Sequence, residues 1–167
     1  AAVRQAAASP RPTFIRVGRI KVPDLPVETT TLERGRFQLL RDGPDVTIVA
    51  IGTTVARALE AATRLAREGV SARVLNAVYL APLDSGAILA AADDTSAIVT
   101  AEEANVAGGL GAAVAAVVLQ GGARQRVPLE MLGFRDFAPT GDVSFLLERS
   151  GLTAEGIAQA VQRALRL

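Results

Sequence analysis

The sequence contains no cysteine and no histidine among its 167 residues. The lack of cysteine excludes disulfides, thiolate nucleophiles and zinc sites built on thiolates. The lack of histidine removes the commonest general base and the commonest transition-metal ligand. Acid–base or metal catalysis by this chain alone is therefore disfavoured, and no metal site is predicted.

The net charge of the sequence is small, and its hydrophobic runs are short. The formal charge is +1, so the sequence offers no broad basic surface for nucleic acid. The longest uncharged apolar run, residues 106–119, has 14 residues, whereas about 18–20 are needed to cross a bilayer. Neither nucleic acid nor a membrane is predicted as a partner, and a cytoplasmic location is expected.

The only methionine, Met131, is internal, and no signal peptide opens the sequence. Residue 1 is therefore expected to be a boundary made by cleavage or cloning. Residues 1–8 are interpreted as the end of a helix.

Strand and helix patterns alternate through most of the chain. Helices are predicted where apolar residues recur at three- and four-residue intervals, and strands where short β-branched and apolar runs occur. The predicted helices cover residues 54–68, 82–92, 109–120 and a last segment that begins after Thr153. The predicted strands cover residues 37–41, 46–51, 70–78, 97–101 and 126–132. This alternation predicts an α/β domain with a largely parallel sheet covered on both faces.

Turn and cap residues mark several boundaries. Residues 42–45, Asp-Gly-Pro-Asp, predict a turn that pairs its two flanking strands as an antiparallel hairpin. Gly69 stands where a left-handed cap would end the first long helix. Thr153 is predicted to cap the start of the last helix.

Residues 97–111 join a buried strand, two adjacent glutamates, a Gly-Gly turn and an apolar helix. Such a segment places its carboxylates at the carboxyl edge of the sheet, where ligands and partners dock. Paired carboxylates can act as acid and base, but neighbours on an extended segment point in opposite directions. Solvated or interface carboxylates are therefore the favoured interpretation of Glu102 and Glu103.

The Gly-Gly-Leu-Gly run at residues 108–111 suggests dinucleotide binding, because glycine turns at helix N-termini bind pyrophosphate. A G-x-G-x-x-G match beginning at Gly109 would need glycine or alanine at the position of Val114. A tight turn with close helix packing is therefore preferred. The helix 109–120 carries no polar side chain before Gln120, so both its own sheet and a neighbour are expected to cover it.

Arg19 follows a short β-rich segment, residues 13–17, and lies close to Arg16 and Lys21. A guanidinium at this place could hold a phosphate through two parallel hydrogen bonds. The alternative from the pattern alone is a surface charge.

Five ordered blocks together resemble the C-terminal region of the transketolase family of thiamine-diphosphate enzymes. The blocks are FIRVGR at 14–19 with KVP at 21–23, DVTIVAIG at 45–52, PLD at 82–84, the stretch 99–111 and GLTAEGI at 151–157. The likeness is strongest to the separate C-terminal subunit of split bacterial transketolases. It is weaker to 1-deoxyxylulose-5-phosphate synthase and to the β subunits of 2-oxo acid dehydrogenases, which share the domain.

The resemblance implies a three-layer α/β/α fold around a five-stranded mixed sheet with one antiparallel strand. It assigns residues 1–22 to the end of the preceding pyrimidine-binding domain, 23–36 to a linker and 37–167 to the transketolase C-terminal domain. It further implies a structural and dimerising part of an enzyme that transfers a two-carbon ketol unit between sugar phosphates. Thiamine diphosphate and Mg²⁺ lie in the family between two other domains, so this chain alone is expected to bind neither.

The resemblance also implies site residues and partners. Arg19 falls where the family places an arginine that contacts the sugar-phosphate substrate. The partners implied are a second copy of the chain and the N-terminal portion or subunit that carries the cofactor domains. No catalytic or cofactor-binding residue is expected here. The residues expected at the homodimer interface are Glu102, Glu103, Asn105, Gly108 and Gly109.

Three points remain open. Many split transketolases have histidine after the paired glutamates, where this chain has Ala104, so a diverged member is an alternative. The parent enzyme could be 1-deoxyxylulose-5-phosphate synthase, which decarboxylates pyruvate. The chain could also be a non-catalytic module that binds a nucleotide or another anion at the helix start formed by Gly108 and Gly109.

Overall fold

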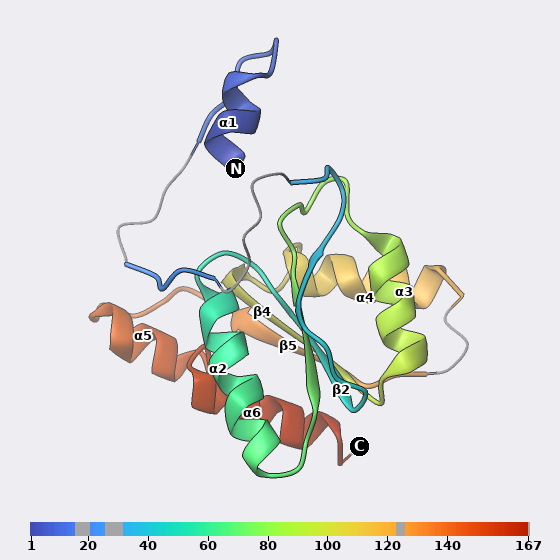
Figure 1. Cartoon of the computed structure of the whole chain (residues 1–167). Helices are drawn as coiled ribbons and strands as arrows, with labels where there is room; N and C mark the ends of the chain where they lie inside the picture. The colour runs from blue at the N-terminus through green and yellow to red at the C-terminus, as the bar shows by residue number, and fades with distance from the viewer. Residues whose placement is uncertain (16–20, 26–31, 123–125, 167) are drawn as a thin grey trace.

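A five-stranded sheet forms the centre of the computed structural model, which describes residues 1–15, 21–25, 32–122 and 126–166 (Figure 1). The strand order is β1-β3-β2-β4-β5, and among the described strands only β1 runs antiparallel to its neighbour. The strands are β1 Gln38–Arg41, β2 Val46–Ala50, β3 Ala72–Asn76, β4 Ile98–Asn105 and β5 Leu129–Phe134. The helices are α1 Ala2–Ala7, α2 Thr54–Arg67, α3 Ser85–Asp94, α4 Leu110–Gln120, α5 Val143–Arg149 and α6 Ala154–Ala164. The predicted mixed α/β sheet is confirmed.

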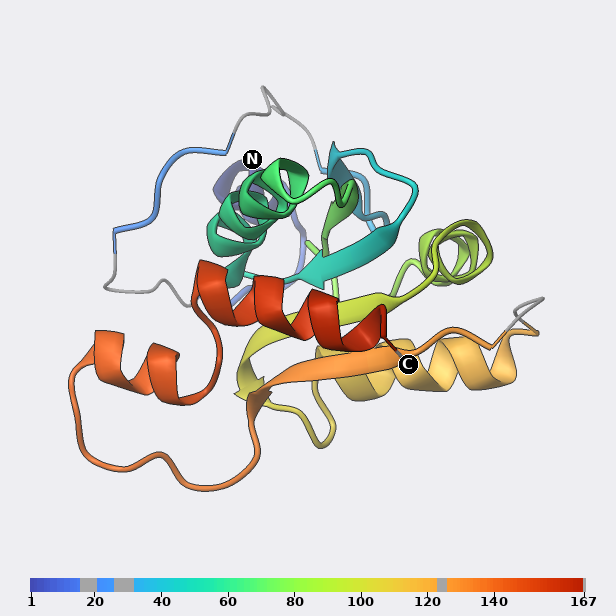
Figure 2. The same ribbon diagram turned by 90° about the horizontal axis from the view of Figure 1, so that it is seen from below.

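Two pairs of helices cover the two faces of the sheet (Figure 2). Helices α2 and α6 pack together on one face, and α3 and α4 pack on the other. Adjacent residues of β3 point into different cores, as the two-residue period of a strand requires. Val74 joins Ile157 of α6 in one cluster, whereas Leu75 joins Leu110 of α4 in the other. The three-layer α/β/α arrangement is therefore confirmed.

The end of α2 and the start of α6 lie where the nearby residues of the sequence predict them. Helix α2 ends at Arg67, and Gly69 just beyond it has a φ of 82°, the left-handed conformation that favours glycine after a helix. Helix α6 begins after Thr153, whose hydroxyl accepts a hydrogen bond from the backbone N–H of Gly156 at 3.0 Å. Both predicted caps are confirmed.

Asp84 sets the start of α3 and also holds the start of β1. Its Oδ1 accepts a hydrogen bond from the N–H of Ala87 at 3.1 Å, and its Oδ2 accepts one from the N–H of Phe37 at 2.9 Å. The helix therefore begins at Ser85, three residues later than predicted. The carboxylate is buried, so these two bonds tie distant parts of the chain together.

The predicted hairpin between the first two strands is wrong. β1 pairs with β3, and β3 lies between β1 and β2. The connecting residues 42–45 cross the start of β3, where the Asp45 carboxylate accepts a hydrogen bond from the Ser71 N–H at 2.6 Å. A Cβ on Gly43 would lie 2.6 Å from the carbonyl oxygen of Ser71. The largely buried β3 needs backbone partners on both sides, and β1 supplies them on the second side.

Strand β4 is longer than predicted because its last residues still pair with β5. Asn105 lies opposite Phe134, and the N–H of Val106 donates to the carbonyl oxygen of Phe134 at 2.9 Å. The strand therefore extends beyond residue 101 and includes both glutamates.

The sequence patterns do not predict α5. Asp142 starts this short helix by accepting a hydrogen bond from the N–H of Phe145 at 2.9 Å. That bond, together with the hydroxyl of Ser144, holds the pKa of the Asp142 carboxyl below its ordinary value. A helix of seven residues has too few turns for a clear apolar period.

The N-terminal segment forms α1, which confirms the helix predicted at residues 1–8. In Figure 1 this helix stands outside the three layers. Residues 13–15, the described part of the predicted β-rich segment, form no strand. No helix in the described ranges is long and apolar enough to cross a membrane.

Two threonines that are both fully buried differ in their hydrogen bonding. The hydroxyl of Thr54, at the start of α2, lies 2.9 Å from the carbonyl oxygen of Ile51 and 2.8 Å from that of Ala101. The hydroxyl of Thr100, in β4, has no hydrogen-bond partner in the described part of the chain. A buried polar atom without a partner lowers stability.

We expect Thr100→Val to leave the free energy of unfolding unchanged or to raise it by up to about 1–2 kcal/mol, because valine removes an unpaired hydroxyl. The matched control Thr54→Val removes a paired hydroxyl and is expected to lower the free energy of unfolding by about 1–3 kcal/mol. Urea unfolding followed by circular dichroism measures both changes. A clear loss of stability in Thr100→Val would contradict this account.

Candidate functional site

A hollow of about 580 Å³ lies at the carboxyl ends of β2 and β4. It is lined by residues 51–53, Leu80, 102–105 and 107–110. Along the chain, β2 is followed by β3 on one side and then by β4 on the other, so the sheet changes its winding direction between β2 and β4. Open α/β sheets bind ligands and partners at such a switch point.

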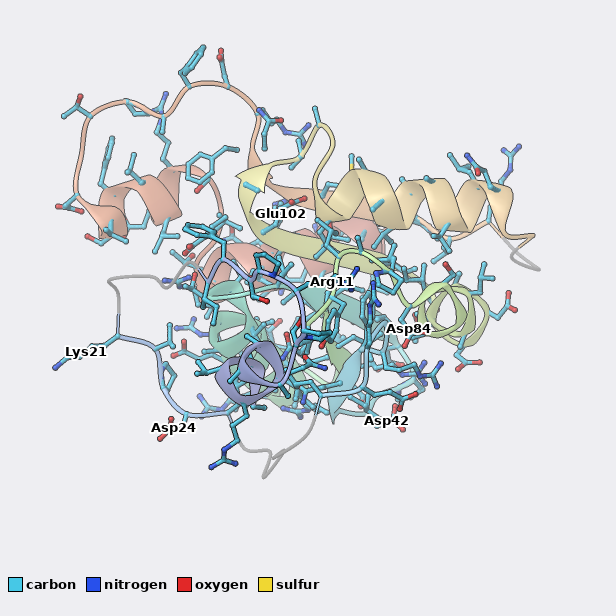
Figure 3. All side chains as sticks on the ribbon, turned by 90° about the horizontal axis from the view of Figure 1, so that it is seen from above. Arg11, Lys21, Asp24, Asp42, Asp84 and Glu102 are labelled. Atoms are coloured by element: carbon cyan, nitrogen blue, oxygen red, sulfur yellow. The ribbon has the colours of Figure 1, made fainter. Side chains whose placement is uncertain are left out.

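Glu102 is 2% exposed and holds the start of α4 from the end of β4 (Figure 3). Its Oε2 accepts a hydrogen bond from the N–H of Leu110 and its Oε1 accepts one from the N–H of Gly111, both at 2.8 Å. The first N–H groups of a helix have no partner inside the helix, and the positive end of the helix dipole favours a carboxylate there. The segment of residues 103–109, which consists of the last three residues of β4 and the turn before α4 and is called the loop below, is therefore anchored at both ends.

The glycines at residues 108–111 serve backbone geometry and close packing. Gly108 has a φ of 89°, in the left-handed region. At Gly109 a Cβ would overlap the carboxylate of Glu102 and would lie 2.6 Å from the carbonyl oxygen of Asn105. At Gly111 a Cβ would lie 2.7 Å from the sulfur of a methionine in β5. The preferred interpretation of the glycine run, a tight turn with close packing, is confirmed.

Glu103 points away from Glu102. Its Oε1 lies 3.2 Å from a guanidinium nitrogen of Arg57 in α2, and its side chain is 31% exposed. The opposite orientation expected of neighbours on a strand is confirmed, so the two carboxylates do not converge on one substrate. Asn105 is also used locally, because its side-chain oxygen accepts a hydrogen bond from the N–H of Ala107 at 2.8 Å.

The start of α4 offers no free site for an anion. The N–H groups of Leu110 and Gly111 are both occupied by Glu102, and a phosphate would have to displace this internal carboxylate. The two negative charges would also repel each other. The geometry therefore speaks against the nucleotide-binding or anion-binding alternative at Gly108 and Gly109.

Small and apolar groups remain on the outer surface of the loop and of α4. Ala104, Ala107 and Gly108 are exposed, and Leu80 is partly exposed beside them. Helix α4 buries only Leu110, Gly111 and Val114, while Leu119 is 84% exposed. A surface whose polar groups are already paired inside the chain suits packing against another protein better than chemistry. The neighbour predicted to cover α4 stays a prediction.

The predicted site residues differ in whether the structure describes them and in how exposed they are. Arg19, the predicted substrate contact, lies outside the described residues, as does Arg16. Lys21 is described and exposed. Glu103, Asn105 and Gly108 are accessible at the loop surface, whereas Glu102 and Gly109 shape the loop from inside.

Sequence reasoning missed the inward role of Glu102. A signal for it is present, because α4 begins after Gly109, which has no side chain to cap the helix. A long apolar helix without Ser, Thr, Asp or Asn at its start needs another acceptor. The glutamate at the end of the preceding strand supplies that acceptor.

Comparisons with known proteins show a clear family relationship. The chain matches the family model described as transketolase, C-terminal domain, over residues 35–157. It is 43% identical to the 6-deoxy-6-sulfo-D-fructose transketolase subunit SqwH of Clostridium sp. strain MSTE9, over 96% of this chain and 49% of that protein. It is 38% identical to 1-deoxy-D-xylulose-5-phosphate synthase of Symbiobacterium thermophilum, over 92% of this chain and 24% of that protein.

A similar solved structure is a split gene transketolase described as an inactive beta4 tetramer. It shares 42% identity and a TM-score of 0.90 with this chain, over 99% of this chain and 54% of that one. The chain therefore spans about half the length, or less, of these relatives.

We expect Glu102→Ala to lower the free energy of unfolding by about 2–4 kcal/mol, because two buried N–H groups lose a charged acceptor. Glu102→Gln is expected to fall between Glu102→Ala and the unchanged chain, since one amide oxygen can still accept one of the two bonds. Thermal and urea unfolding measure the losses.

The matched control is the neighbouring exposed carboxylate. Glu103→Ala removes a partly exposed ion pair and is expected to cost less than about 1 kcal/mol. Equal losses for the two alanine variants would refute the anchoring role of Glu102.

Proposed function

Because the chain belongs to the transketolase family and forms its C-terminal domain, we propose that it is the structural part of an enzyme that transfers a two-carbon ketol unit between sugar phosphates. The observation that carries the proposal is the match of 99% of this chain to a split transketolase at a TM-score of 0.90. The site supports it, since its carboxylates are engaged inside the chain and do not converge on a substrate.

We place thiamine diphosphate and Mg²⁺ in the other half of the complete enzyme. The described residues do not fit this cofactor. They contain no group of three or more Asp or Glu side chains that could hold a metal ion, and the sequence has no histidine or cysteine. The helix start that could receive a pyrophosphate is filled by Glu102. The chain alone is therefore expected to be inactive.

We propose two partners for the chain. One is the N-terminal portion or subunit that carries the cofactor, since the relatives are about twice as long or longer. The other is a second copy, which would cover the loop of residues 103–109 and the outer face of α4. Glu103, Asn105 and Gly108 would contact this copy, while Glu102 and Gly109 would hold the loop in shape. The tetramer of the split gene transketolase supports association between copies.

We assign residues 1–22 to the end of the preceding domain and 23–36 to a linker. The family match begins at residue 35, close to the proposed end of the linker. We also propose that the complete enzyme is cytoplasmic and acts in pentose phosphate metabolism.

We expect the purified chain to show no ketol transfer, and activity to appear when the cofactor-bearing portion is added together with thiamine diphosphate and Mg²⁺. Coupled assays with sugar phosphates and with a sulfonated sugar measure the reaction and identify the substrate class. Decarboxylation of pyruvate in the reconstituted enzyme would instead assign it to 1-deoxyxylulose-5-phosphate synthase. Turnover by the chain alone would overturn the proposal.

We propose that Arg19 binds the anionic group of the sugar substrate. A guanidinium holds a phosphate through two parallel charge-assisted hydrogen bonds, so Arg19→Ala in the reconstituted enzyme is expected to raise KM for phosphorylated sugars about tenfold or more. The turnover number is expected to change less, because binding rather than chemistry is lost. Lys21→Ala, two residues away, is the control. An unchanged KM in Arg19→Ala would remove this assignment.

A further inference from the structure

Gln5, in helix α1, links three parts of the chain that are far apart in sequence. Its side-chain oxygen accepts a hydrogen bond from the hydroxyl of Tyr79, and its side-chain nitrogen donates one to the carbonyl oxygen of Leu32 at 3.3 Å. Tyr79 follows the carboxyl end of β3, and Leu32 precedes β1. Although α1 stands outside the three layers, Gln5 attaches it to the main body.

Both polar groups of the Gln5 amide are used, and the partners set their directions. Leu32 offers a carbonyl oxygen, which can accept but not donate, so the amide nitrogen has to face it. The amide oxygen then faces Tyr79, whose hydroxyl can donate. The amide is therefore held between its two partners in one orientation.

Leu25 attaches the same N-terminal segment at a second point. It is partly buried and packs against the core cluster formed by the sheet with α2 and α6. Lys21, four residues earlier, is exposed and points away from the main body (Figure 3). In the sequence, Arg19 lies between Gln5 and Leu25. The stretch that carries the proposed substrate contact therefore has an attachment to the domain on each side.

The attachment at Tyr79 is near the edge of the sheet that carries the candidate functional site. Leu80, next to Tyr79, lines the hollow of about 580 Å³ together with residues that follow β2 and β4. This carboxyl edge is where open α/β sheets bind ligands. The split gene transketolase matches 99% of this chain, so the N-terminal segment is part of the shared fold. Gln5 thus fastens the segment beside the site.

An arginine binds an anion well only when the chain holds the guanidinium where the anion arrives. If the segment takes several conformations, the apparent affinity falls with the fraction of molecules that have the arginine in place. Attaching both sides of a segment to the domain removes many of those conformations. Loss of one attachment is therefore expected to weaken substrate binding without changing the chemical step.

We propose that Gln5 is a positioning residue, which holds Arg19 where it meets the anionic group of the sugar substrate. The inference rests on the proposed function and extends it, because Gln5 acts through Arg19 and does not itself touch the substrate. Tyr79 is the group of the main body to which Gln5 is fastened.

The first test measures steady-state kinetics in the reconstituted enzyme. Gln5→Ala is expected to raise KM for phosphorylated sugars about three- to tenfold and to change kcat less than about twofold, because only the fraction of correctly placed arginine falls. Tyr79→Phe removes one of the two bonds and is expected to raise KM less. The control Gln159→Ala removes another exposed helical glutamine, paired with Glu155, and is expected to change neither constant. An unchanged KM in Gln5→Ala would overturn the inference.

A double variant separates positioning from a general structural role. If Gln5 acts through Arg19, Gln5→Ala adds little to KM once Arg19→Ala is present. Two effects that multiply would mean that Gln5 acts independently of Arg19, and the inference would fall. A raised KM in Arg19→Ala but not in Gln5→Ala keeps the substrate contact and rejects only the positioning. An unchanged KM in Arg19→Ala rejects both, and no ketol transfer in the unchanged enzyme rejects the proposed function itself.

The second test observes the contact without any reaction. Tyr79 is the only tyrosine and the sequence has no tryptophan, so tyrosine fluorescence of the purified chain reports on this phenol alone. Gln5→Ala is expected to change the emission, whereas Gln159→Ala is expected to leave it as it is. Circular dichroism is expected to show unchanged folding in both variants, since both side chains are exposed. The same emission with and without the Gln5 side chain would show that the contact is not made in solution, and the inference would fall.

Discussion

The bonds between the Glu102 carboxylate and the first N–H groups of α4 fix the carboxyl edge of this domain. They join the end of a central strand to the start of a helix that has no capping side chain of its own. With Glu102 turned inward, strand geometry turns Glu103 outward to Arg57, and the loop between strand and helix has little freedom left.

The same bonds explain why this site, which looks like a ligand-binding crevice, has no free carboxylate for catalysis. It lies at the switch point of the sheet, it has glycines before a helix, and it contains two carboxylates. One carboxylate already serves as the anion of that helix, and the other is paired with an arginine. The position is the one that related α/β folds use for binding, but the polar groups are committed to the architecture.

The features predicted correctly from sequence are those encoded by neighbouring residues. The period of α2, the glycine at its end and the threonine before α6 act within a few residues, and each appears in the structure. The pairing of β1 could not be read in this way, because it depends on β3, which follows more than thirty residues later. Helix α5 was missed because its start depends on one aspartate and its single buried leucine gives no period.

The same distinction, between features encoded by neighbouring residues and features that depend on distant ones, applies to the candidate site. Its location at the carboxyl edge and the opposite directions of the two glutamates follow from the strand pattern alone. The burial of Glu102 does not, because its two partners lie eight and nine residues further along, across a loop whose path the pattern leaves open. Resemblance supplied the family, whereas the assignment of Arg19 rests on sequence position only.

The close approach between Glu102 and Gly109 has a consequence for the evolution of this domain. A side chain at position 109 would occupy the volume of the Glu102 carboxylate, so position 109 cannot gain a side chain while Glu102 is kept. A lineage that gains a side chain at position 109 has to shorten or remove the acid at position 102 and find another acceptor for the helix. These two positions are expected to covary among homologues, and a substitution tolerated in one branch would be deleterious when transplanted singly into another.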